Sequence, residues 1–255
     1  MPRLQPGPHE LGQNFLQDSA VIARIVALVA QTSGPIVEWG TGDGALTRPL
    51  ARLKRPLEGI EIDAAKAQRL GRCVGPHVCI SQGDILRHAP PQASTVVSNV
   101  PFHLTTPVLR HLLALTAWSH AILVVQWEVA RKRAGVGGST QLTAQWWPWF
   151  EFRLEARVPA AAFSPRPSVD GGILTIDRRA APLLPQAEQQ TYQKWVTAIF
   201  SGRGRTLQEV LAVSGGLSRR DSSRFCLSQH LPPKALPRNL TASQWVAAFQ
   251  LRSGQ

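Results

Sequence analysis

The fold is decided by the stretch PIVEWGTGDG at residues 35–44. Its first five residues are mostly apolar, as in a strand buried on both faces of a parallel sheet. Glycines at alternate positions, Gly40, Gly42 and Gly44, then let the backbone turn sharply and let a ligand lie against it without meeting a Cβ atom. A dinucleotide fold would use the spacing G-x-G-x-x-G, whereas here G-x-G-x-G follows the acidic Glu38. The stretch predicts a strand and a cofactor-binding loop; a plain turn is the alternative.

Similar apolar runs on either side of this loop alternate with stretches of helical spacing. The expected strands are residues 35–39, 57–62, 78–81, 95–99 and 121–126, and the expected helices are residues 19–30, 46–53, 64–73 and 106–115. Strands separated by helices predict a doubly wound α/β fold with a parallel sheet. Two later runs, residues 152–158 and 171–177, flank the Pro-rich residues 159–167 and predict a terminal hairpin added to that sheet.

The composition changes near residue 180. A Pro-containing linker at residues 180–185 leads into helical sequence with turn signals. Residues 181–255 carry nine Lys and Arg against three Asp and Glu, so half of the net charge lies on this shorter part. We expect an α/β catalytic domain over residues 1–180 and a basic helical RNA-binding domain over residues 181–255.

The overall charge favours a polyanionic partner. Lys and Arg number 28 against 16 Asp and Glu, a net charge of +12, and all but five of the 28 are arginine. Guanidinium groups bind phosphate through two parallel hydrogen bonds, so this excess favours nucleic acid. The alternative is a basic protein whose arginines reflect genomic base composition and no such partner.

Composition also excludes several classes of protein. No apolar run reaches the roughly 18 residues of a membrane span, and the first residues contain no apolar core of a secretory signal. The cysteines Cys73, Cys79 and Cys226 have no CxxC spacing, and the histidines form no ligand pairs. We therefore expect a cytoplasmic protein without a disulfide framework, a metal site or a membrane partner.

An acidic residue lies at or just after the end of each of the next two expected strands. Glu61 can accept both ribose hydroxyls of a nucleoside cofactor. Asp84 can accept from an adenine amino group while Ile85 packs on the ring, and Ile62 belongs to the same expected site. Taken singly, these acids could be a solvated strand end and a helix N-cap. Because ligands of open α/β sheets bind at successive strand ends, their order after a glycine loop indicates a nucleoside cofactor.

The motif Ser98-Asn99-Val100-Pro101-Phe102 follows the fourth expected strand. The exocyclic amine of adenine is a poor nucleophile because its lone pair is delocalised into the ring. The side-chain carbonyl of Asn99 and a backbone carbonyl of Val100 or Pro101 can accept both N–H bonds and aim that lone pair at a sulfonium methyl group. Phe102 would stack on the extruded base. The alternative is a strand-end turn with a core phenylalanine.

These residues resemble the adenine-N6 rRNA methyltransferases, which are Rossmann-like and use S-adenosylmethionine. Three more segments resemble the same family: HELGQNFL at residues 9–16, QWEVARKRAG at 126–135 and FSPRPSVD at 163–170. Within the family the motifs look like the erythromycin-resistance (Erm) branch. That branch methylates one adenine in the peptidyl transferase region of 23S rRNA and blocks macrolide, lincosamide and streptogramin B antibiotics. The other branch dimethylates adenines of 16S rRNA and is the closest rival.

The resemblance implies a set of site residues. Cofactor contacts are expected at Asn14, Leu16, Gly40, Gly42, Glu61, Ile62, Asp84, Ile85 and Asn99. Phe163 is expected as a second aromatic wall beside the base, with ordinary hairpin packing as the alternative. Arg131, Lys132 and Arg133 are expected to contact RNA phosphates, with a solvated charged face as the alternative. The expected substrate is naked 23S rRNA or an assembling large subunit, and the expected enzyme is a monomer without a metal.

Two rival functions come from other classes. A non-catalytic RNA-binding or transcription factor could keep the fold, but the intact motif at residues 99–102 argues against it. An NAD-dependent dehydrogenase is disfavoured by the glycine spacing and by the absence of an evident hydride-transfer constellation. The tryptophans Trp146, Trp147 and Trp149 could stack on RNA, although packing in a core is the favoured interpretation.

Overall fold

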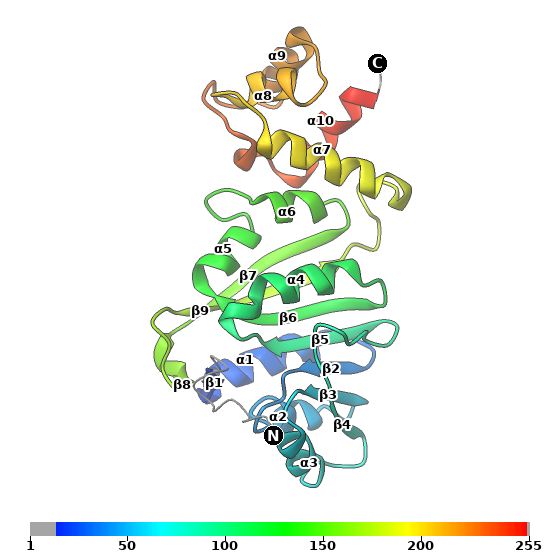
Figure 1. Cartoon of the computed structure of the whole chain (residues 1–255), viewed down its shortest axis with the longest axis vertical. Helices are drawn as coiled ribbons and strands as arrows, with labels where there is room; N and C mark the ends of the chain where they lie inside the picture. Colours follow the sequence, from blue (N-terminus) through cyan, green and yellow to red (C-terminus); the bar gives the residue numbers. More distant parts are fainter. Residues whose placement is uncertain (1–13, 254–255) are drawn as a thin grey trace, which may run out of the picture. The chain divides into compact units, whose positions relative to one another are not determined.

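The parallel sheet expected from the sequence is present in the computed structural model, which describes residues 14–253. Its strands are β2 (Ile36–Trp39), β3 (Leu57–Glu61), β4 (Val78–Gln82), β5 (Ser94–Asn99), β6 (Trp118–Gln126), β7 (Phe150–Val158) and β9 (Gly171–Arg178). The seven strands lie in the order β4-β3-β2-β5-β6-β9-β7 (Figure 1). The expected strands and helices all occur, with ends shifted by three residues or fewer, so the predicted α/β fold is confirmed.

The strand pairing places a switch point between β2 and β5. Strand β2 pairs in parallel with both β3 and β5, and the chain then runs outward to β4 on one side and to β6 on the other. Strand β9 pairs antiparallel with β6. Where the order of strands reverses, the loops leave the sheet in opposite directions and open a crevice at the carboxyl ends of the strands. The glycine loop and the Asn99 motif leave the sheet at this point.

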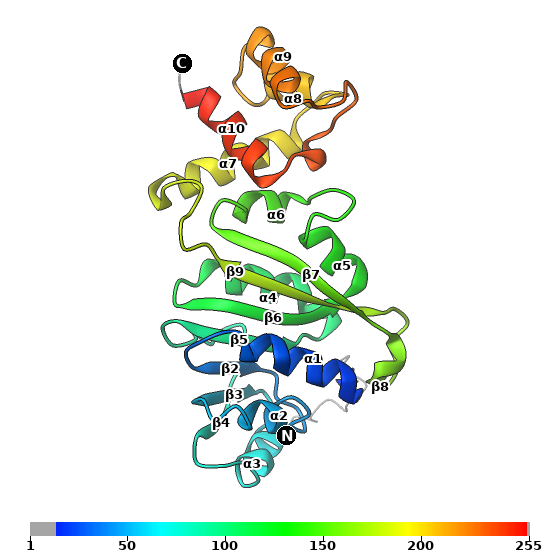
Figure 2. The same cartoon turned by 180° about the vertical axis from the view of Figure 1, so that it is seen from behind.

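Helices cover both faces of the sheet. They are α1 (Ser19–Ala30), α2 (Thr47–Ala51), α3 (Ala64–Gly71) and α4 (Thr105–Ala114). Helix α4 lies on the face toward the viewer in Figure 1, and α1 lies on the opposite face in Figure 2. Asp18 and Asp63 cap α1 and α3 by accepting two backbone N–H groups each. With both faces covered, β2 is buried throughout and β5 is buried up to its last residue, Asn99, as expected for central strands of a parallel sheet.

A second, two-stranded sheet joins distant parts of the chain. Strand β1 (Phe15–Leu16) pairs antiparallel with β8 (Phe163–Ser164), so that Phe15 lies opposite Ser164. The chain therefore brings its N-terminal segment to the loop before β9. This pairing has no signal in the sequence, because two residues are too few to show an alternation of apolar and polar side chains.

The chain forms two compact units. The first comprises residues 14–130 and 153–177, and the second comprises residues 131–152 and 178–253. The boundary between residues 177 and 178 lies close to the one expected at residue 180. Residues 131–152, expected in the α/β domain, instead belong to the unit that holds the C-terminal helices.

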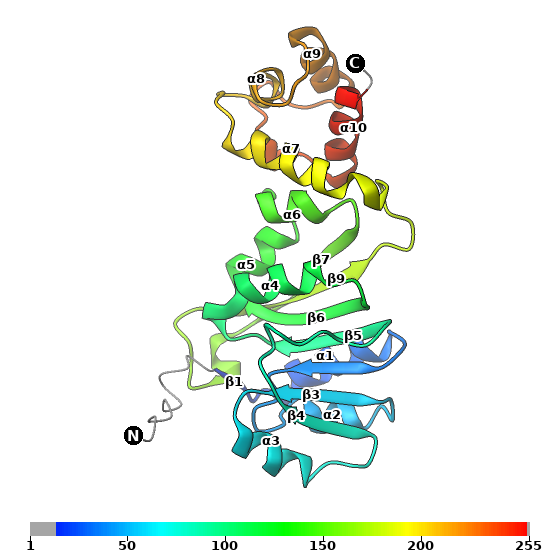
Figure 3. The same ribbon diagram turned by 45° about the vertical axis from the view of Figure 1, so that its right-hand side comes forward.

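The second unit is built around an aromatic core. Its helices are the end of α5 (Trp127–Arg133), then α6 (Gln141–Trp146), α7 (Gln189–Ser201), α8 (Leu207–Val213), α9 (Arg219–Ser228) and α10 (Ala242–Ser253). Helix α6 packs on α7 (Figure 3), where the Tyr192 hydroxyl donates to the Ala144 carbonyl at 2.9 Å. Trp149 is buried edge-on to Tyr192, as expected for core packing. Within residues 14–253, no helix has the length and apolar character needed to cross a bilayer.

Candidate active site

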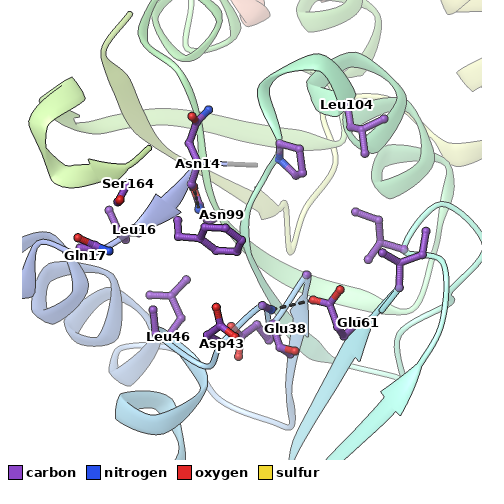
Figure 4. A pocket seen from close by; sticks show the side chains of 18 of the residues that line it. Asn14, Leu16, Gln17, Glu38, Asp43, Leu46, Glu61, Asn99, Leu104 and Ser164 are labelled. Atoms are coloured by element: carbon purple, nitrogen blue, oxygen red, sulfur yellow. Dashed lines mark hydrogen bonds between the residues drawn. The ribbon is translucent and has the colours of Figure 1, made fainter. Parts of the chain in front are cut away.

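A cavity of about 490 Å³ lies at the carboxyl ends of the central strands, within the first unit. Its volume suits a small-molecule ligand. All nine expected cofactor positions line it: Asn14, Leu16, Gly40, Gly42, Glu61, Ile62, Asp84, Ile85 and Asn99. The fold brings these residues together although they are spread over 86 positions of the chain. Figure 4 shows Asn14 and Asn99 toward one end of the cavity and Glu38 and Glu61 toward the other.

The glycine loop forms one wall of the cavity. Gly40 has a φ of 78°, which favours glycine, and a Cβ atom at this position would meet nothing within 4 Å. The space that a Cβ would fill is thus open to a ligand. Gly42, with a φ of 53°, lies under the ring of Phe15, and an added Cβ would come within 3.2 Å of that ring. The loop therefore needs glycine both for its turn and for close contact with the N-terminal segment.

The carboxylate of Glu61 is held rigidly at the end of β3. One oxygen accepts the backbone N–H of Gly42 at 2.7 Å (dashed in Figure 4), and the other accepts the backbone N–H of Asp63 at 3.0 Å. The residue is only 3% exposed. Each oxygen keeps a second lone pair, so the group can accept two further hydrogen bonds from adjacent hydroxyls.

Apolar side chains and a second carboxylate lie beyond Glu61. Asp84 is fixed by a turn in which one of its oxygens accepts the N–H of Leu86 at 2.9 Å. Ile62 is 58% exposed although it is a large apolar residue. Together with Ile85 it gives this part of the cavity an apolar surface that suits the flat ring of a base.

Glu38 also lines the cavity and was not among the predicted site residues. It is 1% exposed, and its Oε2 atom has no hydrogen-bond partner within residues 14–253. Burial raises the pKa of the Glu38 carboxyl to about 8, and the nearby negative charge of Glu61 adds to the shift. The neighbouring Thr41 hydroxyl likewise has no partner in the described part of the chain. A charged residue inside an otherwise apolar strand was the sequence signal that could have identified this position.

The amide of Asn99 has a fixed orientation. Its nitrogen donates to the backbone carbonyl of Asn14 at 2.8 Å, which leaves the side-chain oxygen as an acceptor. The Pro101 carbonyl already accepts the N–H of Leu104 at 2.8 Å, whereas no residue among 14–253 donates to the Val100 carbonyl. Pro101 lines the cavity and its carbonyl keeps a second lone pair, whereas Val100 is 1% exposed and is not among the lining residues, so both carbonyls stay candidates for the second acceptor.

The two aromatic side chains expected to flank the target base lie against each other. Phe102 and Phe163 are edge to face, with ring centroids 6.0 Å apart. Phe163 is only 4% exposed and packs in the core, and neither ring is among the residues that line the cavity. The contact with a base stays a prediction for both residues.

The expected RNA contacts lie at the end of α5. Lys132 is exposed, while Arg131 and Arg133 are half-buried, and Arg133 donates to the Thr140 hydroxyl. Phosphate contact by this segment stays a prediction. The expected N-terminal segment begins at His9, and its residues 9–13 lie outside the described residues.

The cavity carries an excess of negative charge. Four acids line it, Glu38, Asp43, Glu61 and Asp84, against Arg48 and His103, and the acids outnumber the bases even with Glu38 mostly protonated at pH 7. Such a lining favours a ligand with positive charge. Among residues 14–253, no group of three or more His, Cys, Asp or Glu side chains is arranged to hold a metal ion.

Asp170 anchors the loop that carries Phe163. Its carboxylate accepts the N–H of Ala160 at 2.8 Å and pairs with Arg157 at 2.7 Å, and its backbone carbonyl accepts the N–H of Trp127 at 2.9 Å. The Ala160 hydrogen bond, with Arg157 nearby, holds the pKa of Asp170 below its ordinary value, so the carboxylate is ionised at neutral pH. The loop is thereby tied to the start of α5.

We expect the Asp170→Asn variant to lower the methyl transfer predicted from the sequence by about tenfold or more, because small displacements of a positioning loop impair catalysis strongly. The measurement is kcat and KM for the nucleic-acid substrate, with cofactor affinity measured in parallel. Asp177→Asn, an ion-pair variant far along β9, serves as the control. Equal losses in both variants would contradict the anchoring role.

Comparisons with known proteins agree with one another. A family model described as "Ribosomal RNA adenine dimethylase" matches residues 7–250. The chain is 47% identical to the mycinamicin-resistance protein MyrB of Micromonospora griseorubida, over 96% of this chain and 79% of that protein. It is 48% identical to an rRNA adenine N-6-methyltransferase of Corynebacterium diphtheriae, over 82% and 83% of the two chains. The crystal structure of the 23S rRNA methyltransferase ErmE is similar with a TM-score of 0.86 and 31% identity, covering 94% of this chain and all of that one.

Proposed function

Because the chain belongs to the ribosomal RNA adenine dimethylase family, we propose that it transfers methyl groups from S-adenosylmethionine to N6 of an adenine in 23S rRNA, conferring macrolide, lincosamide and streptogramin B resistance. The observation that carries this proposal is the cavity in which Asn99 meets the acidic residues at successive strand ends. The match to ErmE and to a mycinamicin-resistance protein supports 23S rRNA over the 16S alternative.

The cavity fits the proposed cofactor. Glu61 would accept hydrogen bonds from the ribose hydroxyls, and Asp84 would accept one from the adenine amino group. The open space at Gly40 would let the cofactor lie close to the protein backbone. The unpartnered oxygen of Glu38 suits a cation. When bound, S-adenosylmethionine supplies a methyl group made electrophilic by its sulfonium.

The residues at the end of β5 act on the target base. The Asn99 side-chain oxygen and a backbone carbonyl of Val100 or Pro101 accept the two N–H bonds of the adenine amine and orient its lone pair toward the methyl group. Phe102 stacks on the flipped base. Methylation makes the nitrogen cationic and acidic, so it loses a proton to water and no strong general base is required. Positioning is the main contribution of the protein.

Primer extension on both rRNAs tests the proposal, using cells with and without the gene. A gene-dependent stop in 23S rRNA alone is expected, together with resistance to the antibiotics. A stop in 16S rRNA alone would assign the chain to the small-subunit branch. Transfer of labelled methyl from S-adenosylmethionine to a 23S rRNA fragment, read by mass spectrometry, identifies the nucleotide and the number of methyl groups.

Removing the charges of Arg131, Lys132 and Arg133 by alanine substitution is expected to weaken RNA binding. The slope of log K against log salt should fall by about 2, since each lost phosphate contact with single-stranded RNA removes roughly 0.7. Lys132→Ala alone, which leaves the Arg133 contact with Thr140 intact, should give a smaller change in the same direction. An unchanged salt slope in both variants would show that the segment does not contact RNA.

A further inference from the structure

The positive charge of the protein is concentrated on the second unit. Residues 131–152 and 178–255 carry 14 Lys and Arg against 4 Asp and Glu, a net charge of +10. The remaining residues carry 14 against 12, a net charge of +2. The unit that lacks the catalytic cavity thus holds most of the electrostatic attraction for a polyanion.

A second cavity of about 610 Å³ lies entirely within this unit. We name it the arginine–glycine cavity. Its lining includes Gly137, Gly138, Trp147, Glu151, Arg179 and Arg238. The glycine turn and the segment before α10 form one continuous wall, because Ser139 donates its N–H to the Arg238 carbonyl at 2.8 Å.

The two arginines of the cavity are positioned to bind an anion. The Nε atom of Arg179 donates to the Trp147 carbonyl at 3.1 Å, which orients the guanidinium. Its terminal nitrogens make no hydrogen bond or ion pair within residues 14–253. The stem of Arg238 lies on Gly138, where a Cβ would come within 3.4 Å of it, and its guanidinium likewise pairs with no carboxylate in that range.

The turn itself favours a close approach by a ligand backbone. Gly137 and Gly138 have φ values of 78° and 119°, which exclude most side chains from this wall. The guanidinium of Arg131 lies near the position that a Gly137 Cβ would take, at 3.8 Å. One acid, Glu151, lines the cavity, so the cationic groups outnumber it. Trp147 adds an aromatic surface of the kind on which unpaired bases stack.

We propose that the arginine–glycine cavity binds a backbone phosphate of single-stranded rRNA, with Arg179 and Arg238 as its ligands. Each guanidinium offers two parallel N–H donors to phosphate oxygens, and this contact is independent of base identity. The cavity therefore anchors the strand while the first unit handles the target adenine. The inference rests on the proposed function, because it requires an RNA substrate.

The test compares two double variants of the full-length enzyme. Arg179→Gln with Arg238→Gln removes both cavity charges, and Arg219→Gln with Arg220→Gln removes two charges from α9 in the same unit. The probe is the 23S rRNA fragment that the wild-type enzyme methylates. We expect the cavity variant to raise the Kd for RNA by about tenfold or more and to lower the salt slope by roughly 1.4, with cofactor affinity unchanged. The control variant should change the Kd for RNA and the salt slope much less.

Equal changes in the two double variants, or no change in the cavity variant, would overturn the proposal. Arg238→Gln is measured alone as well, because that side chain is exposed and makes no structural hydrogen bond in the described chain, so the fold is retained. Methylation of the 23S fragment by the wild type is scored separately. If it fails, the proposed function falls; if it succeeds while the cavity variant binds like the control, only the cavity assignment falls.

Discussion

The Asn99→Ala variant is expected to lose methyl transfer by about 100- to 1,000-fold, the loss typical of removing one preorganised polar group from a transition state. The Asn14 carbonyl fixes the Asn99 amide, so its oxygen occupies one position before the base arrives. Alanine removes both that oxygen and the constraint. Single-turnover transfer of labelled methyl at saturating cofactor and RNA measures the effect, with cofactor affinity and Tm expected to stay near the wild-type values.

Two variants separate orientation from binding. Asn14→Ala keeps the backbone carbonyl that accepts from Asn99, so its kcat at saturating cofactor should remain close to that of the wild type. Asn99→Asp keeps an acceptor oxygen but sets a carboxylate oxygen where the amide nitrogen lay, 2.8 Å from the Asn14 carbonyl. Its activity should fall between those of the wild type and alanine variant. Turnover near wild type in Asn99→Ala would remove Asn99 from the proposed role.

The sheet was predictable because its central strands are covered on both faces. Short apolar runs, such as residues 121–125, are typical of such strands, and the turns between them are marked by glycine and acidic residues. The positions of Glu61, Asp84 and Asn99 could be predicted from the same rule, since parallel strands end at one edge of the sheet. The cavity then follows from topology, which is why all nine expected cofactor positions line it.

The second unit was less predictable because contacts between residues distant in the sequence decide which segments belong to it. Residues 131–152 interrupt the α/β part of the sequence, yet they pack with α7 through contacts such as Tyr192 with Ala144. No local sequence pattern predicts a packing partner nearly 50 residues away. A linear division at residue 180 therefore splits the net charge equally, whereas the folded units divide it as +2 and +10. The pairing of β1 with β8 likewise joins segments far apart in the sequence, Phe15 with Ser164, and each strand is too short to show a pattern of its own.

Glu38 shows a limit of reading motifs by position alone. The sequence places an acid before the glycine loop, but only the fold shows that this carboxyl is fully buried on the cavity wall with one unpartnered oxygen. An acid whose pKa is raised to about 8 is mostly protonated at pH 7. A cation bound nearby favours the ionised form and so lowers that pKa. Binding of the proposed cofactor should therefore release a proton from Glu38.

The Glu38→Gln variant is expected to alter the dependence of stability on pH. The unfolded carboxyl ionises above about 4.5, while the folded one keeps its proton until about pH 8, so the wild type loses stability as pH rises between these values. The full effect is on the order of 5 kcal/mol at most. Glutamine mimics the neutral acid and has no such loss. Urea unfolding at pH 5 and pH 8 should show similar stabilities at pH 5 and a more stable variant at pH 8.

Calorimetry in buffers of different ionisation enthalpy measures the proton released when S-adenosylmethionine binds. Glu38 should contribute close to one proton per cofactor at pH 7, and this contribution should be absent from Glu38→Gln. Other titratable groups facing the cavity, including Asp43, Asp84 and His103, are unchanged in the variant, so the difference between the two proteins isolates Glu38. Affinity of the wild type should also rise with pH toward 8 more steeply than affinity of the variant. The same number of protons released by the wild type and by Glu38→Gln would mean that the cofactor does not change the ionisation of the Glu38 carboxyl.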